Sequence, residues 1–129
     1  MLGSTAAACD GLTVTDAWVR EPPPGAGAVA IYMRLANTGE TALTVDSVTS
    51  PAFAHGMLHE TYVDGDRARM RHVDALRLAP GEQRELAPGG LHLMLVKPLA
   101  ALPAAGDDVA LVLGCGDARL ELHVPVRRE

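Results

Sequence analysis

Short β-prone runs separated by turn residues recur along almost the whole chain, and they restrict the fold more than any other feature. Several runs alternate apolar with polar positions, and clusters of Pro, Gly, Asn and Asp interrupt them. We expect eight strands, over residues 11–20, 29–35 and 42–48, in two runs flanking 64–65, and over 91–96, 109–113 and 118–124, with a short ninth strand at 83–87 as an option. Helix is expected at most as one turn within 98–103. Eight or nine such strands predict an all-β protein, an antiparallel β-sandwich or barrel.

Composition narrows the class of protein further. The 129 residues are the size of one domain, and 48% of them are hydrophobic while only 3% are aromatic, so the core must be aliphatic. The net charge is −5 and there is no basic run, which argues against a nucleic-acid partner because phosphate binding needs clustered Lys and Arg. No stretch approaches the ~20 apolar residues of a transmembrane helix.

The N-terminal segment has the small residues that end a secretory signal, in Thr5-Ala6-Ala7-Ala8. The apolar run that normally precedes such an ending is missing. We therefore expect residues 1–10 to be a disordered remnant of an export segment, with a merely flexible Ala-rich tail as the alternative. Residues 11–129 are expected to form the single domain.

The two cysteines, Cys9 and Cys115, are not arranged as Cys-x-x-Cys. A disulfide between them would tie the N-terminus to a late turn in an oxidising compartment, and closing so long a loop would stabilise the fold by about 4–5 kcal/mol. Two unrelated thiols are the alternative. Lipid attachment to Cys9 is a third option, although Ala6 stands where an export lipobox usually carries Leu.

Four residues in the second half of the chain have side chains that suit one soft metal ion. Ten residues separate His59 from Met70, and twenty-one more lead to His92. Met94 follows after one further residue. All four are neutral ligands, and thioether sulfur selects Cu(I) over hard cations such as Mg²⁺. The set predicts a Cu(I) site, although a Met in a β-protein is more often core filler and a lone His more often a surface or structural residue.

A hairpin could bring part of this set together. Asp64-Gly65 lies between two β-rich runs and predicts a two-residue type I′ loop. In that register His59 lies directly opposite Met70, on the same face of the hairpin. His92 and Met94 also share a face of their own strand, because side chains two residues apart point the same way. The same register pairs Met57 with His72 and Glu60 with Arg69, and the other histidines, His55, His72 and His123, are expected at the surface or in structural roles.

The intervals resemble those of the periplasmic copper(I) chaperone family called PCuAC, whose signature is His or Met, ten residues, Met, twenty-one residues and His-x-Met. The resemblance covers roughly residues 12–126. The local contexts that carry it are Asp16-Ala17-Trp18-Val19-Arg20 before a Pro-rich loop, Ala36-Asn37-Thr38-Gly39, Leu58-His59-Glu60-Thr61, Arg69-Met70-Arg71, and Pro88-Gly89-Gly90-Leu91-His92-Leu93-Met94-Leu95.

The resemblance implies a Greek-key, cupredoxin-like β-sandwich that is exported to the periplasm, with a membrane anchor in the precursor as an option. It implies a monomeric, non-enzymatic chaperone that binds one Cu(I) through His59, Met70, His92 and Met94. The expected acceptor is the CuA centre in cytochrome c oxidase subunit II, often served beside Sco-type thiol proteins. Because the family's first ligand is His or Met, Met57 is an alternative to His59.

Two other classes stay open at this point. A blue-copper electron carrier shares the sandwich but needs a Cys thiolate with two His and a weak axial Met, and only Cys115 with His123 offers such a start. A metal-free structural sandwich needs no ligands at all. An enzyme is disfavoured, since the acidic residues are scattered and no Gly-x-Ser-x-Gly motif occurs.

Overall fold

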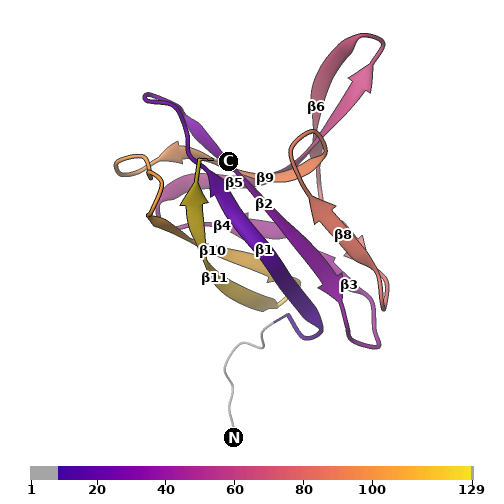
Figure 1. The fold of residues 1–129 in the computed structure, drawn as a ribbon. Helices are drawn as coiled ribbons and strands as arrows, with labels where there is room; N and C mark the ends of the chain where they lie inside the picture. The colour runs from indigo at the N-terminus through magenta and orange to yellow at the C-terminus, as the bar shows by residue number, and fades with distance from the viewer. Residues whose placement is uncertain (1–8, 129) are drawn as a thin grey trace, which may run out of the picture.

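The computed structural model describes residues 9–128, which form eleven strands and contain no helix (Figure 1). The described residues therefore include no helix that is long and apolar enough to cross a membrane. The strands are β1 (Leu12–Arg20), β2 (Ala28–Asn37), β3 (Leu43–Val45), β4 (Ser47–Thr49), β5 (Phe53–Asp64), β6 (Arg67–Val73), β7 (Leu76–Leu78), β8 (Gln83–Leu86), β9 (Leu91–Pro98), β10 (Asp108–Cys115) and β11 (Ala118–Arg127).

The strand count exceeds the expected eight or nine. One reason is that the run at 42–48 is divided at Asp46 into β3 and β4, each of three residues. The helical turn expected within residues 98–103 does not form; that segment has no helical residue. Turns rich in Pro and Gly separate β1 from β2 and β8 from β9, because Pro cannot donate to a ladder and turns favour Gly. β11 nevertheless continues through Pro125 to Arg127, beyond its predicted end at residue 124.

Nine strands form one sheet that folds over itself, in the order β4-β10-β11-β1-β2-β9-β5-β6, with β8 beside β2. The pair β3–β7 stands apart from it. Every pairing is antiparallel except that of β1 with β11, which run parallel at Val19 and Val126. The sheet does not close into a barrel, and the fold is the antiparallel β-sandwich predicted from the sequence.

The core is aliphatic, as the composition requires. Its largest fully buried side chains are nearly all Leu, Val and Ile, including Ile31, Leu35, Leu93, Leu95 and Leu111. Each such side chain contributes about 1.5–3 kcal/mol on burial. Leu93 and Leu95 point into this core, so the side chains that alternate with them on β9 must point to the opposite face.

A disulfide joins Cys9 to Cys115 at the end of β10, with the Cα atoms 5.8 Å apart. The disulfide expected as one of three options is confirmed, and both sulfur atoms are therefore unavailable as thiols. Cys9 is buried, with 3% of its surface exposed. Residues 1–8, where most of the expected export remnant falls, lie outside the described residues.

The β5–β6 hairpin forms, but its predicted register is wrong. Asp64 pairs with Arg67, so the loop is Gly65-Asp66. Gly65 has a φ of 69°, whereas Asp64 is not among the residues with positive φ. A type I′ loop at Asp64-Gly65 would need a positive φ at both residues. A type II′ loop at Gly65-Asp66 needs a positive φ only at its first residue, Gly65. The ion pair accordingly joins Glu60 to Arg71 at 2.7 Å, and not to Arg69.

Candidate metal centre

β5 and β9 lie side by side and carry four of the potential donors in two adjacent rows. Met57 is directly opposite Met94, and His59 is directly opposite His92. Residues directly opposite in an antiparallel pair hold their Cβ atoms about 4.5–5.5 Å apart on one face. The two imidazole rings have centroids 5.8 Å apart and are mutually perpendicular. This face is the one opposite Leu93, away from the core.

β6 lies on the other side of β5 and extends the same face. His59 is opposite His72, with ring centroids 6.1 Å apart, and Thr61 is opposite Met70. The predicted partners of His59 and Met57 on β6, Met70 and His72, are therefore both wrong. When the loop shifts by one residue, each residue of β5 lies opposite a residue of β6 two positions further along the chain. Met70 therefore stays on the predicted face but lies opposite Thr61, one cross-strand pair away from His59.

The four predicted residues thus share one face, but not one degree of burial. His92 is 4% exposed, whereas Met70 is 59% exposed. Met70 lies on β6, an edge strand whose hairpin with β5 projects from the sandwich (Figure 1). The structure therefore brings His59, His92 and Met94 close together and leaves Met70 at the exposed rim.

Among the described residues, each of the two central imidazoles keeps a ring nitrogen without a hydrogen-bond partner. His92 donates from Nδ1 to the carbonyl oxygen of Gly90 at 3.0 Å, which leaves Nε2 with a free lone pair. Nδ1 of His59 is buried without a hydrogen-bond partner. Burial lowers the pKa of His59 below its ordinary value of 6.5, and repulsion from His92 and His72 lowers it further. A neutral imidazole is the form that binds metal.

An aromatic pair continues the histidine row on the far side of β9. Tyr32 lies between Trp18 and His92, with ring centroids 4.9 Å and 6.4 Å away. A bulge at Asp16 and Ala17 sets this up, because it shifts the β1–β2 register between Thr15 and Trp18. Asp16 itself has a φ of 55°, a left-handed conformation that Asp tolerates better than most residues.

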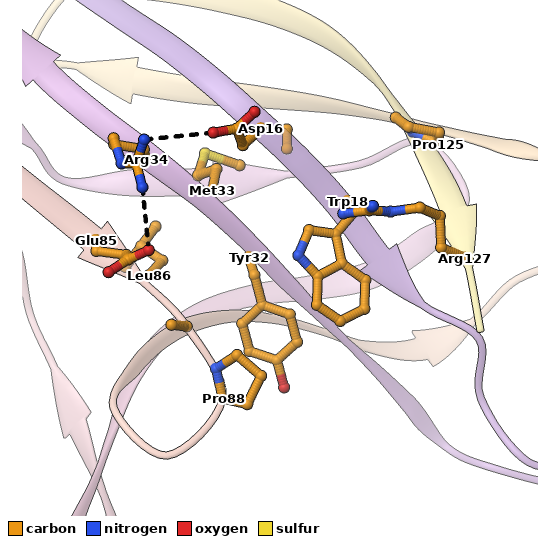
Figure 2. A pocket seen from close by; sticks show the side chains of 12 residues that line it. Asp16, Trp18, Tyr32, Met33, Arg34, Glu85, Leu86, Pro88, Pro125 and Arg127 are labelled. Atoms are coloured by element: carbon orange, nitrogen blue, oxygen red, sulfur yellow. Dashed lines mark hydrogen bonds and ion pairs between the residues drawn. The ribbon is translucent and has the colours of Figure 1, made fainter. Parts of the chain in front are cut away.

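A cavity of about 540 Å³ opens beside this aromatic pair (Figure 2). Arg34 spans it between Asp16 and Glu85, at 3.4 Å from each carboxylate. The guanidinium of Arg127 lies 4.8 Å from the centre of the Trp18 ring. The cavity borders the donor face through Tyr32, but no His and only one Met, the buried Met33, is among its lining residues.

The donor chemistry of this face fits a soft ion better than a hard one. Within residues 9–128, no group of three or more His, Cys, Asp or Glu side chains is arranged to hold a metal ion. Imidazole and thioether, the donors that this face carries, suit copper, whereas carboxylates suit Mg²⁺ and Ca²⁺. Sequence reasoning missed Tyr32 and the Gly90 carbonyl, and it misplaced His72; only the corrected hairpin register identifies His72 as a neighbour of His59.

Solved structures identify the fold: it is that of the PCuAC domain. The chain matches the copper-bound PCuAC domain from PmoF2 with a TM-score of 0.78 and 21% sequence identity, over 97% of this chain and 99% of that domain. It matches the solution structure of CuI-DR1885 from Deinococcus radiodurans with a TM-score of 0.70 and 26% identity, over 98% of this chain and 83% of that one. The PCuAC-type fold expected from the sequence is confirmed.

Sequence comparison then gives the family. The family model described as "Putative lipoprotein LpqE-like" matches residues 12–126. "Putative lipoprotein Lxx21020" of Leifsonia xyli subsp. xyli (strain CTCB07) is 33% identical over 120 residues, which span 92% of this chain and 70% of that protein. The chain belongs to the LpqE-like family.

Proposed function

We propose that this protein is a copper(I) chaperone that carries one Cu(I) ion on the shared face of β9, β5 and β6. The observation that carries the proposal is the direct apposition of His59 and His92, one row from the apposed Met57 and Met94. The names of the solved relatives, a copper-bound PCuAC domain and CuI-DR1885, support the same cargo.

The ligands we propose are His59, Met70, His92 and Met94. Two imidazoles and two thioethers leave the bound ion with its own single positive charge, and thioethers favour Cu(I). Met70 is the most exposed of the four, so it would be the first to be displaced by an incoming donor from an acceptor protein. Met57 is the alternative to His59, because it lies directly opposite Met94, and it would give a set of one His and three Met.

The cellular role follows from the cargo and the disulfide. Disulfides persist in oxidising compartments, and the relatives are named as lipoproteins, so we propose an exported protein anchored to a membrane through its precursor. It would act as a non-enzymatic monomer, releasing Cu(I) by ligand exchange. The proposed acceptors are the CuA centre of cytochrome c oxidase subunit II and Sco-type thiol proteins.

The competing blue-copper function lacks its essential ligand. That site needs a Cys thiolate, and Cys9 and Cys115 are joined to each other.

A metal-free structural sandwich and a copper chaperone differ in how added Cu(I) should change their stability. A ligand that binds only the native state must raise the melting temperature, so a purely structural protein would show no shift on adding Cu(I).

A Cu(I) competition titration against a chromogenic chelator tests the proposal. Met94→Leu should weaken Cu(I) binding by about tenfold or more, the scale of a 1.4 kcal/mol loss. The matched control is Met33→Leu, because Met33 is buried in the core at 2% exposure and faces away from the donors. Unchanged affinity in both Met94→Leu and Met70→Leu would refute the ligand assignment. Comparing Met57→Leu with His59→Gln identifies which of these two residues is the ligand.

A further inference from the structure

Three imidazoles stand in one row across three neighbouring strands. His59 on β5 is directly opposite His92 on β9 and directly opposite His72 on β6. The neighbouring ring centroids are 5.8 Å and 6.1 Å apart, and both ring pairs meet edge to face. The four predicted ligands include the rings of His59 and His92 but not that of His72.

Each of the three rings has one nitrogen that is not engaged. His92 donates from Nδ1 to the Gly90 carbonyl, and Nε2 of His72 lies 3.2 Å from Oδ1 of Asp74. Nδ1 of His59 has no partner. A histidine that binds a metal through one nitrogen commonly donates the other N–H to a carboxylate or a backbone carbonyl, which fixes its tautomer. The Gly90 carbonyl stands in that relation to His92. Asp74 is the carboxylate closest to the corresponding nitrogen of His72, at 3.2 Å.

His72 also has room to adjust toward a bound ion. Its side chain is 58% exposed on the edge strand. It lines, together with Met57, a small cavity of about 120 Å³ between β4, β5 and β6. The three imidazoles do not converge on one point as they stand.

We propose that His72 is a third imidazole ligand, which lets the same site hold Cu(II) as well as Cu(I). The inference rests on the proposed copper function and deepens it. Thioethers select Cu(I), whereas imidazole is a good ligand for copper in general, so a shift from sulfur to nitrogen donors suits the oxidised ion. The bound species is Cu(II) itself, and no electron transfer by the protein is involved.

Electron paramagnetic resonance of the protein loaded with Cu(II) tests this directly. The wild type should show hyperfine coupling to three imidazole nitrogens and His72→Gln to two. His72→Gln should weaken Cu(II) binding about tenfold or more while Cu(I) affinity stays within about twofold. His123→Gln is the matched control, because His123 lies on β11, opposite Ala110 and outside the histidine row. Equal melting temperatures would show that both variants are folded.

The outcomes separate this inference from the proposed function. An identical Cu(II) spectrum and affinity in His72→Gln would overturn the role of His72. Wild-type protein that binds Cu(I) but not Cu(II) would also overturn it, and would leave the Cu(I) chaperone standing. Wild-type protein that binds neither ion would refute the proposed function itself.

Discussion

His59 and His92 lie directly opposite each other on adjacent strands, with perpendicular rings 5.8 Å apart, and this pair is the centre of the donor face. Thirty-two residues separate them in the sequence. The pairing of β5 with β9 brings them together, and the Gly90 carbonyl orients His92. Every proposed ligand lies within one or two rows of this pair.

The lowered pKa of His59 predicts how the apo protein responds to acid. Burial and the charges of His92 and His72 hold the folded pKa below the unfolded value of 6.5. The unfolded chain therefore binds more protons as the pH falls below 6.5, and stability is lost progressively until the pH passes the folded pKa. Urea unfolding between pH 7.5 and 5 should show this loss, and His59→Gln should reduce it. A pH dependence identical in the two proteins would show that His59 is not the group responsible.

Copper affinity should follow the same ionisation. Because metal binding needs the neutral imidazole, a lowered pKa keeps His59 ready to bind at pH values where an ordinary histidine is already charged. We expect Cu(I) affinity to hold as the pH falls through 6.5 and to decline only at lower pH. Competition titrations at a series of pH values measure this. A decline that begins well above pH 6.5 would show that another group controls binding.

Trp18 should report on the site. It is the only tryptophan, and its ring is linked through Tyr32 to His92. Cu(II) quenches nearby indole emission, so fluorescence should fall and level off at one equivalent of Cu(II). His92→Gln should remove the saturable phase, while His123→Gln should keep it. Equal quenching in both variants would mean that the ion binds elsewhere.

The disulfide should stabilise the fold without taking part in copper binding. It closes a loop across 106 residues, and removing such a bond typically costs about 2–5 kcal/mol. Cys9→Ser combined with Cys115→Ser should lower the free energy of unfolding by that amount in urea titrations. Cu(I) affinity of the folded double variant should stay within about twofold. A large loss of affinity would indicate that a cysteine sulfur contributes to the site.

Gly56 allows β4 to approach β5 next to the donor row. A Cβ at this position would collide with the carbonyl oxygen of Val48. Gly56→Ala should therefore destabilise the protein by about 1–3 kcal/mol, as overpacking does. Gly27→Ala is the control, because nothing lies within 4 Å of a Cβ there and its φ is not positive. Thermal unfolding of both variants checks this, and equal melting temperatures would contradict it.

Much of the fold was predictable because its signals are local. Strand periodicity and turn residues indicated the sandwich, and the low aromatic content indicated an aliphatic core. The hairpin register was not predictable from Asp64-Gly65, because the choice between two adjacent loops depends on which residues take positive φ. A shift of one residue in the loop replaced Met70 by His72 as the partner of His59.

The candidate site was predictable only in part, and for a related reason. Residues two apart on a strand share a face, so a shift of partner by two residues leaves the face unchanged. The shared face within each donor pair was therefore predicted, whereas the partners across the strands were not. The pairing of β5 with β9 depends on contacts far apart in sequence, which no local pattern encodes. The neighbours that orient the site, Gly90 and Tyr32, became apparent only from that pairing.

X-ray absorption of the protein loaded with one equivalent of Cu(I) tests the central claim most directly, because it distinguishes sulfur from nitrogen neighbours of the ion. The proposed site predicts about two nitrogen and two sulfur neighbours, with one sulfur lost in Met94→Leu. A first shell made only of nitrogen and oxygen, or a spectrum unchanged by Met94→Leu, would contradict it.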